Sequence, residues 1–285
     1  MSTVVGARAT GQFILPDRDF GAYLFDLDGT IYLGDQLLPG AERLLSHLRE
    51  RGSRTIFLSN NPTRDPEMYV EKLRKLGVAA EVGDVINTVV SLVAWLQRVH
   101  PGATVFAIAE QPLIRALIKA GIRLSEDPSE IDIVVASYDR TFDYRKLQIA
   151  FDALWQYGKA ILVTTNPDRY CPFPGGRGEP DAAAIVAAIE ASTGVKCQAN
   201  AGKPDQIMID AALEVLHVDV SDCVMVGDRI YTDIRMAINA GIASALVLTG
   251  ESTLESLGEY PVEQRPLYVL DRIDNLVPDL RPLTL

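Results

Sequence analysis

The segment Tyr23-Leu24-Phe25-Asp26-Leu27-Asp28-Gly29-Thr30 joins a short apolar run to two carboxylates and a glycine. The apolar run predicts a buried strand, and Gly29 gives the backbone the freedom to turn directly after it. Asp26 and Asp28 could both face one pocket if the chain leaves extended geometry there. Carboxylates that close repel each other, which favours a divalent cation or a shared proton between them. The competing interpretation is a polar turn in which an aspartate caps a helix.

Outside this segment, short apolar runs alternate with amphipathic stretches along most of the 285 residues. Further strands are predicted at residues 55–58, 224–226 and 245–248, and helices at residues 40–51, 66–76, about 204–215 and 232–240. This alternation is typical of βαβ units that build a parallel sheet. We therefore predict an α/β fold whose core is a doubly wound, Rossmann-like parallel sheet.

The middle of the chain is predicted to form a second α/β unit. Its strands are expected at residues 104–108, 131–136 and 160–164, and its helices at residues 111–120, 145–157 and 181–192. We place the boundaries near residues 88 and 196, so that residues 1–88 and 196–285 form one domain and residues 89–195 are inserted into it. Residues before about Asp19 are expected to form a loosely held arm, and Trp95 and Trp155 are expected in the core.

Polar side chains follow three of the predicted core strands. Asp26 and Asp28 follow the first strand, Ser59 and Asn60 the second, and Asp228 a later one. In open parallel sheets, ligands bind at the carboxyl ends of the strands. This coincidence is the strongest organisational signal in the sequence, and it predicts a site at that edge of the sheet.

Two further motifs are suited to a phosphate. The Ser59 hydroxyl, the Asn60 amide and the N–H groups of the turn could hold phosphate oxygens, although Ser-Asn-Asn-Pro at 59–62 is also an ordinary turn sequence. Lys203, in the Gly-Lys-Pro motif at 202–204, would place a positive charge beside a helix N-terminus. The tripeptide could equally be a surface loop, and it lacks the flanking residues of a P-loop.

The last motif is Gly227-Asp228, with Asp233 five residues later. An aspartate at a strand end offers the hard oxygen ligand that Mg²⁺ prefers, and Asp233 could orient either that ligand or Lys203. Asp233 also lies in the first turn of the next predicted helix, where a carboxylate interacts favourably with the helix dipole in any case.

Composition narrows the class of partner. The 27 basic and 38 acidic residues give a formal net charge of −11, so we expect no binding to nucleic acid or to anionic membranes. A small anion would need local positive charge. The widely separated Cys171, Cys197 and Cys223 predict reduced thiols in a cytoplasmic protein. The longest nearly apolar run, residues 89–96, is too short to span a bilayer.

Taken in order, the motifs are an acid pair, a Ser-Asn turn, a lysine and a second acid pair. The set DLDGT (26–30), SNN (59–61), GKP (202–204) and GDRIYTD (227–233) resembles the haloacid dehalogenase-like (HAD) phosphatases. The long insertion, which contains Thr-Asn-Pro-Asp at 165–168, resembles that of the class IIA members, which carry a large α/β cap. Most variants of the last motif have Asp where Tyr231 stands, a position that holds no ligand in the pattern.

The resemblance implies a role for each motif residue. Asp26 would attack phosphorus and form an aspartyl-phosphate. Asp28 would protonate the leaving oxygen and then deprotonate the hydrolytic water. Ser59, the Asn60 main chain and Lys203 would bind the transferred phosphoryl group.

The resemblance also implies a Mg²⁺ cofactor. Its expected ligands are the carboxylates of Asp26 and Asp228 and the main-chain carbonyl of Asp28, with Asp233 placed behind them. A metal and a lysine together supply the charge stabilisation that phosphoryl transfer needs. The metal and Lys203 would thus offset the charge of the four aspartates in one pocket.

The predicted function is the Mg²⁺-dependent hydrolysis of small phosphorylated metabolites, either sugar phosphates or nucleoside monophosphates. A phosphomutase would use the same acids, but such enzymes usually carry a small helical cap between the first two motifs. About thirty residues separate Asp28 from Ser59, which leaves no room for one. A dehalogenase would not need Asp28. A phospho-receiver signalling module shares the acidic pocket and the lysine, but it is far shorter and retains its phosphate.

In class IIA relatives the cap covers the active site and selects the leaving group. By that resemblance, Asn166 and Asp168 are expected to line the substrate entrance. Caps diverge freely, so sugar phosphates, nucleoside monophosphates, glycerol phosphate and pyridoxal phosphate all stay open as substrates. Relatives often dimerise through the cap, and a homodimer of this chain stays open as well.

Overall fold

The computed structural model describes residues 7–10, 13–173 and 176–281. The chain divides into two compact units. Unit 1 comprises Met1–Leu58, Tyr69–Val85 and Ala212–Leu285, and unit 2 comprises Ser59–Met68 and Ile86–Ala211. Unit 2 is therefore inserted into unit 1, and it includes a short segment that precedes the long insertion in sequence.

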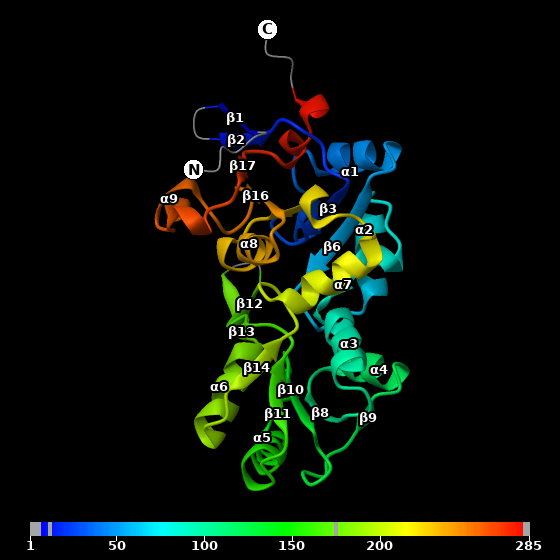
Figure 1. Cartoon of the computed structure of the whole chain (residues 1–285), viewed down its shortest axis with the longest axis vertical. Helices are drawn as coiled ribbons and strands as arrows, with labels where there is room; N and C mark the ends of the chain where they lie inside the picture. The colour runs from blue at the N-terminus through cyan, green and yellow to red at the C-terminus, as the bar shows by residue number, and fades with distance from the viewer. Residues whose placement is uncertain (1–6, 11–12, 174–175, 282–285) are drawn as a thin grey trace. The chain divides into compact units, whose positions relative to one another are not determined.

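Within the described residues, unit 1 is built on an eight-stranded sheet (Figure 1). Its strands, in order across the sheet, are β1 (Ala7–Thr10), β2 (Phe13–Pro16), β17 (Tyr268–Leu270), β16 (Ala243–Val247), β15 (Cys223–Gly227), β3 (Ala22–Asp26), β6 (Arg54–Ser59) and β7 (Val85–Asn87). Neighbouring strands from β17 to β6 are parallel, whereas β2 is antiparallel to both β1 and β17. A small antiparallel hairpin, β4 (Tyr32–Leu33) with β5 (Gln36–Leu37), follows β3.

The order of the parallel strands decides where a ligand site can form. The chain runs from β3 to its neighbour β6 on one side, and it later adds β15, β16 and β17 on the other side. Such a reversal opens a crevice at the carboxyl ends of the two strands where the order changes, here β3 and β15. This is the doubly wound α/β arrangement expected from the sequence, and the predicted fold class is confirmed.

The helices of unit 1 alternate with these strands. They are α1 (Ala41–Glu50), α2 (Pro66–Lys75), α7 (Gln206–Leu216), α8 (Arg235–Ala240) and α9 (Leu254–Gly258), and both α2 and α7 run across the division between the units. A π-helical turn (Ile230–Ile234) leads into α8, and short 3₁₀ turns lie at Val82–Asp84, Val220–Asp222, Val262–Gln264, Ile273–Leu276 and Pro278–Leu280.

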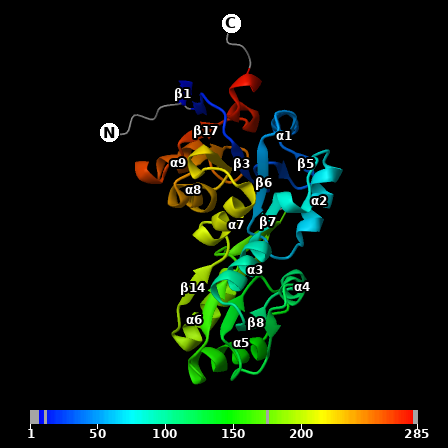
Figure 2. The ribbon, with the colours of Figure 1, turned by 45° about the vertical axis from the view of Figure 1, so that its right-hand side comes forward.

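Helices cover both faces of the unit 1 sheet because successive strand residues point to opposite faces. Phe25 and Val247 belong to the apolar cluster that includes the buried faces of α1 and α2. Leu246, one residue away, packs on the opposite face against Ile230 and Ile234, next to α8. Figure 1 and Figure 2 both place α1 and α2 on one side of β3 and β6, with α8 on the other side.

Unit 2 is an α/β unit of the same style. Its parallel sheet has the order β14 (Cys197–Asn200), β11 (Ile161–Thr164), β10 (Ile133–Ala136), β8 (Thr104–Ile108) and β9 (Arg123–Leu124). Its helices are α3 (Thr88–Val99), α4 (Gln111–Lys119), α5 (Tyr144–Phe151), which continues as a π-helical turn (Asp152–Gln156), and α6 (Ala182–Thr193). An antiparallel hairpin, β12 (Tyr170–Phe173) with β13 (Arg177–Pro180), precedes α6.

The unit 2 sheet is also covered on both faces. Val134 and Leu162 pack with residues of α5 and α6, whereas Val135 and Val163 pack with residues of α3 and α4. Because the strands are parallel, the carboxyl ends of β8, β10, β11 and β14 lie along one edge of this sheet. The loops that leave this edge are the natural place for a recognition surface.

Two sequence-based expectations are wrong. Residues 7–10 and 13–16 form β1 and β2, and Ile14 pairs with Val269 of β17, so this segment is held by the sheet edge instead of forming a loose arm. Trp155 is 62% exposed in the π-helical turn Asp152–Gln156, where its ring stacks on Phe151 instead of packing in the core. Trp95 packs against the unit 2 core as expected. None of the helices described is both long enough and apolar enough to cross a membrane.

Candidate active site

The turn after β3 carries the first acid pair. Phe25 and Leu27 are buried, whereas Asp26 is half-buried and Asp28 is exposed. This alternation indicates that both carboxylates leave the chain on the side opposite the two apolar residues. Gly29 has a φ of +87°, a conformation that residues with a side chain rarely adopt, and so the chain can turn at once. The turn predicted at this position is present.

Asp228 follows β15, the strand on the other side of the point where the strand order reverses. Val226 of β15 pairs with Phe25 of β3, so both strands reach the crevice at nearly the same level. One carboxylate oxygen each from Asp26, Asp228 and Asp233 lie within 4.8 Å of one another. We call these three residues the acidic cluster.

Main-chain N–H groups hold the two most buried members of the acidic cluster. The Glu251 N–H donates to Asp228 Oδ2 at 2.7 Å, and the Arg229 N–H donates to Asp233 Oδ2 at 3.1 Å. Asp228 is 2% exposed and Asp233 is 0% exposed. Their carboxylates are therefore fixed in direction before any ligand arrives.

Three glycines allow the backbone to approach the acidic cluster. A Cβ on Gly250 would lie 2.0 Å from Asp228 Oδ2, and a Cβ on Gly29 would lie 2.6 Å from the same atom. A Cβ on Gly227 would lie 2.3 Å from the Asp233 side chain. Because real Cβ atoms do not approach other atoms this closely, larger residues at these positions would displace the carboxylates.

The electrostatics of the acidic cluster favour a cation. Burial, together with the charges of Asp26 and Asp233, raises the pKa of Asp228 to about 7. Among the described residues, the buried Asp228 Oδ1 has no hydrogen-bond partner, and an unsatisfied buried acceptor is costly. Converging carboxylates with an unsatisfied oxygen are the hard donor set that Mg²⁺ prefers. The residues present therefore fit a divalent cation.

Asp233 contributes one oxygen to the acidic cluster. Its place behind the metal ligands stays a prediction. Asp233 lies in the π-helical turn before α8, and such turns occur frequently at functional sites. Tyr231 in the same turn is 46% exposed, and its hydroxyl donates to Glu251 Oε2 at 3.3 Å. The unusual residue in the motif thus has a surface partner and leaves the cluster intact.

The Ser-Asn motif follows β6 as predicted. Leu58 pairs with Asp26 in the β3–β6 ladder, and Ser59 is the next residue along the chain. The Asn61 N–H donates to Ser59 Oγ at 3.3 Å, and Thr63 donates twice to Asn61 Oδ1, at 2.8 Å and 2.7 Å. The turn chemistry that the sequence offered as an alternative is therefore present, and the phosphate contact of Ser59 stays a prediction.

The Asn60 side chain joins the second motif to the third. Its Oδ1 accepts a hydrogen bond from the Lys203 N–H at 2.8 Å, and its Nδ2 donates to the Lys203 carbonyl at 3.1 Å. A Cβ on Gly202 would lie 2.7 Å from Asn60 Oδ1, so the glycine of this motif permits the contact. Lys203 itself is buried, with 3% of its surface exposed.

The two residues predicted at the substrate entrance belong to the same set of hydrogen bonds. Asp168 Oδ2 accepts from Asn60 Nδ2 at 3.0 Å and from Asn166 Nδ2 at 3.1 Å. The fully buried Asn166 also donates to Asp181 Oδ1 at 3.1 Å, and Asp181 caps α6 by accepting from the Ala182 N–H at 2.6 Å. We call Asn60, Asn166, Asp168, Asp181 and the Lys203 peptide the amide network. An entrance role for Asn166 and Asp168 stays a prediction.

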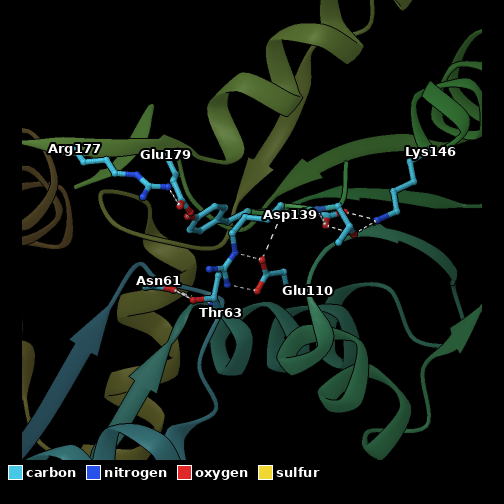
Figure 3. A network of polar contacts seen from close by, with 10 residues as sticks. Asn61, Thr63, Glu110, Asp139, Lys146, Arg177 and Glu179 are labelled. Carbon is cyan, nitrogen blue, oxygen red and sulfur yellow. Dashed lines mark hydrogen bonds and ion pairs between the residues drawn. The ribbon is translucent and has the colours of Figure 1, made fainter. Parts of the chain in front are cut away.

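A second polar group in unit 2 was not indicated by any motif (Figure 3). Arg140 donates to both carboxylate oxygens of Glu110, at 2.5 Å and 2.7 Å, and these hydrogen bonds lower the pKa of Glu110. The Tyr138 hydroxyl donates to Glu179 Oε2 at 2.5 Å, and burial raises the pKa of this tyrosine. Glu110 follows β8, whereas Tyr138 and Arg140 follow β10. The strand-end rule applied to the core would have found them if it had also been applied to the insertion.

The loop after β16 is another part of the site that the motifs did not include. Thr249 Oγ1 donates to the Gly29 carbonyl at 2.7 Å, and the next two residues, Gly250 and Glu251, contact Asp228. This loop also leaves the carboxyl end of a predicted strand, so its position was a usable signal. The loop does not begin with two carboxylates as the segment after β3 does. Its place in the site follows only from its contacts with Gly29 and Asp228, which are distant in sequence.

Comparisons with known proteins agree with this arrangement. A family model described as haloacid dehalogenase-like hydrolase matches residues 23–123, and one described as HAD-hydrolase-like matches residues 200–276. The acid sugar phosphatase of Staphylococcus aureus is 35% identical over 264 residues, which cover 92% of this chain and 99% of the relative. The chain belongs to the haloacid dehalogenase-like hydrolases.

Solved structures of other HAD-like hydrolases have the same fold. The 4-nitrophenylphosphatase of Thermotoga maritima has a TM-score of 0.84 at 36% identity, covering 90% of this chain and 96% of its own. The p-nitrophenyl phosphatase of Archaeoglobus fulgidus has a TM-score of 0.84 at 29% identity, covering 92% and 100%. The predicted family, its class IIA and the enzyme class of phosphoric monoester hydrolase are confirmed.

Proposed function

We propose that this HAD-like hydrolase is a Mg²⁺-dependent phosphatase that hydrolyses small phosphorylated metabolites through an aspartyl-phosphate intermediate. The observation that carries the proposal is the acidic cluster, with Asp26 and Asp228 on the two strands where the sheet order reverses. The relatives are named for the hydrolysis of sugar phosphates and of nitrophenyl phosphate. Sugar phosphates or nucleoside monophosphates are therefore our proposed substrates.

The covalent chemistry is assigned to Asp26 and Asp28. A carboxylate oxygen of Asp26 attacks phosphorus, and the bond between phosphorus and the leaving oxygen breaks as Asp28 donates a proton to that oxygen. Asp28 then accepts a proton from water, whose oxygen attacks phosphorus and breaks the bond to Asp26. Inorganic phosphate leaves, and both aspartates return to their starting state. The exposure of Asp28 suits a group that exchanges protons with a departing alcohol and with water.

Mg²⁺ would be held by the carboxylates of Asp26 and Asp228 and by the main-chain carbonyl of Asp28. When bound, it supplies positive charge that offsets the carboxylates and polarises the phosphoryl group. The Glu251 N–H fixes Asp228, and the Arg229 N–H fixes Asp233, so neither carboxylate has to reorganise on binding. Asp233 is assigned to orienting the ligands, from a position inside the acidic cluster.

The phosphoryl oxygens are assigned to the Ser59 hydroxyl, the Asn60 main-chain N–H and the Lys203 ammonium. The Asn60 side chain is engaged with the Lys203 peptide and Asp168, which is consistent with a role for the main chain of Asn60 in phosphate binding. Burial of Lys203 strengthens its attraction for a phosphate oxygen, because the local dielectric constant is lower than that of water.

The insertion is proposed to act as the cap that selects the leaving group. We keep residues 1–88 and 196–285 as the catalytic domain and residues 89–195 as the cap. Asn166 and Asp168 stay proposed near the substrate entrance. We also propose a cytoplasmic location, on the separated cysteines, and a small-molecule partner in place of nucleic acid or membrane, on the net charge of −11.

The test is the release of phosphate from p-nitrophenyl phosphate by Asp26→Asn. The amide is a far weaker nucleophile than the carboxylate, so kcat should fall by about 10⁴-fold or more while the circular dichroism spectrum is unchanged. The exposed Asp279→Asn is the matched control and should retain full activity. EDTA should silence the wild-type enzyme and Mg²⁺ should restore it. Wild-type turnover by Asp26→Asn would exclude the covalent mechanism, and full activity in EDTA would exclude the metal.

A further inference from the structure

The Asn60 carboxamide forms a two-bond pair with one peptide group. Its Oδ1 accepts from the Lys203 N–H at 2.8 Å, and its Nδ2 donates to the Lys203 carbonyl at 3.1 Å. The main chain of Lys203 is thus held on both sides by one side chain, much as a strand is held by its neighbour in a sheet. The lysine side chain leaves the backbone from a fixed point.

Asp168 supplies the remaining partner of that carboxamide. Asn60 Nδ2 has two hydrogens, one of which it donates to the Lys203 carbonyl and the other to Asp168 Oδ2, at 3.0 Å. If the amide were flipped, its oxygen would face the carbonyl and the carboxylate, and its nitrogen would face the Lys203 N–H. All three contacts would then be repulsive. Asp168 therefore adds a charge-assisted hydrogen bond to the one orientation that clamps Lys203.

Asp168 is itself held by a second amide, that of Asn166. The same Oδ2 atom accepts from Asn166 Nδ2 at 3.1 Å. The Asn166 amide is fixed by donating to Asp181 Oδ1 at 3.1 Å and by accepting from Thr165 Oγ1 at 3.1 Å. Asn166 is completely buried and follows β11. A rigid strand end of unit 2 thereby fixes the position of the Asp168 carboxylate.

The packing around Gly202 is too close for any larger residue at this position. A Cβ on Gly202 would lie 2.7 Å from Asn60 Oδ1, 2.7 Å from the Thr165 carbonyl and 2.9 Å from Thr88 Cγ2. The Asn60 side chain and the Thr165 carbonyl therefore both pack directly against the backbone at Gly202. A small displacement of Asp168 would be passed on to Asn60 and to the Lys203 peptide.

We propose that Asp168 is a positioning residue for phosphate binding, which holds the Asn60 amide in the orientation that fixes Lys203. The proposal rests on the function proposed above in that it takes Lys203 as a ligand of the phosphoryl group. This role is added to the proposed place near the entrance and needs no contact with the leaving group, because the Asp168 carboxylate acts through Asn60. Loss of Asp168 then weakens every substrate equally, including inorganic phosphate, which has no leaving group.

The experiment compares Asp168→Ala with wild type on p-nitrophenyl phosphate, on a panel of sugar phosphates and on inhibition by inorganic phosphate. Displacing a binding group by a fraction of an ångström to 1 Å lowers kcat/KM by about 10- to 100-fold. The same factor is expected for every ester, and inhibition by inorganic phosphate should weaken by about 10-fold. Asp168→Asn retains an oxygen that accepts from one amide, and it should recover part of the loss.

The matched control is Asp139→Asn, which alters a buried carboxylate elsewhere in unit 2. Asp139 follows β10 as Asp168 follows β11, and its partners are Thr141 and Lys146. A general loosening of unit 2 would affect both variants, whereas the proposed role affects only Asp168. Thermal unfolding of both variants shows whether their fold is retained.

A double-mutant cycle tests the route through Asn60. If Asp168 acts only through that side chain, Asn60→Ala combined with Asp168→Ala loses no more activity than Asn60→Ala alone. Additive losses would overturn the proposal. So would a loss confined to some leaving groups with unchanged inhibition by inorganic phosphate, which would assign Asp168 to the leaving group. A wild-type enzyme that neither hydrolyses any ester nor binds phosphate would contradict the proposed function instead.

Discussion

In unit 1 the carboxyl ends of the parallel strands hold like charges together. The oxygens of the acidic cluster, Asp26, Asp228 and Asp233, lie within 4.8 Å of one another, and the pKa of Asp228 is raised to about 7. In unit 2 the same edge of a similar sheet holds its charges in pairs. Glu110 is bound by Arg140.

Other contacts of the unit 2 edge follow the same principle. Lys146 Nζ donates to Asp139 Oδ2 at 2.6 Å, and the Tyr138 hydroxyl donates to Glu179 (Figure 3). Paired groups keep their ordinary charge and hold each other rigid, whereas grouped carboxylates favour a bound cation or proton. Two sheets built by the same rule therefore differ in the charges at their carboxyl edges: carboxylates are grouped in unit 1 and paired in unit 2.

The largest change in activity is expected when one methyl group is added beside Asp228, at the carboxyl edge of the unit 1 sheet. In Gly250→Ala the new Cβ would lie 2.0 Å from Asp228 Oδ2, so the carboxylate or its loop must move. A displacement of about 1 Å in a catalytic group lowers kcat/KM on the order of 100-fold. The measurement is kcat/KM for p-nitrophenyl phosphate at saturating Mg²⁺.

Gly258→Ala is the matched control for Gly250→Ala. Gly258 ends α9, and a Cβ there would have no atom within 4 Å. We expect unchanged activity, because alanine fits this helical position without strain. If Gly250→Ala kept more than a third of wild-type kcat/KM, close packing around Asp228 would not matter for the reaction.

The next expected effect is stabilisation by the metal. A ligand at 100 times its dissociation constant stabilises the folded state by about 2.7 kcal/mol, which for a chain of this size raises Tm by about 5 °C. Mg²⁺ should give this shift in wild type and in Asp139→Asn, and no shift in Asp228→Asn. Differential scanning calorimetry with and without EDTA measures it. An equal shift in Asp228→Asn would place the bound cation outside the acidic cluster.

Most of the strand and helix pattern, and the grouping within each unit, could be predicted from local sequence. Strand ends are marked by an abrupt change from apolar to polar residues, as at Phe25-Asp26 and Leu58-Ser59. A doubly wound sheet then brings such ends to one edge, which is why Asp26 and Asp228 were correctly grouped. The contact between Asn60 and Lys203 has a different origin, because Asn60 follows β6 of one sheet and Lys203 follows β14 of the other.

What the sequence could not supply are contacts that depend on packing between distant segments. Gly250 has no distinctive neighbours in sequence, and its importance follows only from the 2.0 Å that would separate an added Cβ from Asp228 Oδ2. Trp155 lies in a helical apolar pattern, but its side chain is 62% exposed and stacks on Phe151 in the π-helical turn. Strands β1 and β2 are not predictable from the sequence, because the polar and apolar residues in these two short segments do not alternate with a clear period.

The smallest expected effect concerns Asp181, a carboxylate of the amide network that accepts hydrogen bonds from the Asn166 amide and the Ala182 N–H. Burial, and to a lesser degree the charge of Asp168, raises the pKa of Asp181 to about 6, against hydrogen bonds from Ala182 and Asn166. A raised pKa means that the folded state favours the protonated acid. Its stabilising contribution is complete below about pH 4, where the unfolded chain also binds the proton, and it is lost as pH rises to about 6 and beyond. Unit 2 therefore contains one carboxylate, Asp181, whose pKa is raised as that of Asp228 is in unit 1, but to a smaller extent.

Asp181→Asn tests this raised pKa. The asparagine retains an oxygen that caps α6 and accepts from Asn166, but it carries no charge at any pH. Between pH 5 and pH 7, wild type should lose about 1 kcal/mol of stability through Asp181, which lowers Tm by about 2–3 °C, and the variant should lack this component. The measurement is Tm at both pH values in EDTA, so that the metal does not contribute. An identical pH dependence in the two proteins would show that Asp181 titrates as in the unfolded chain, and that the charges of the unit 2 edge are balanced throughout.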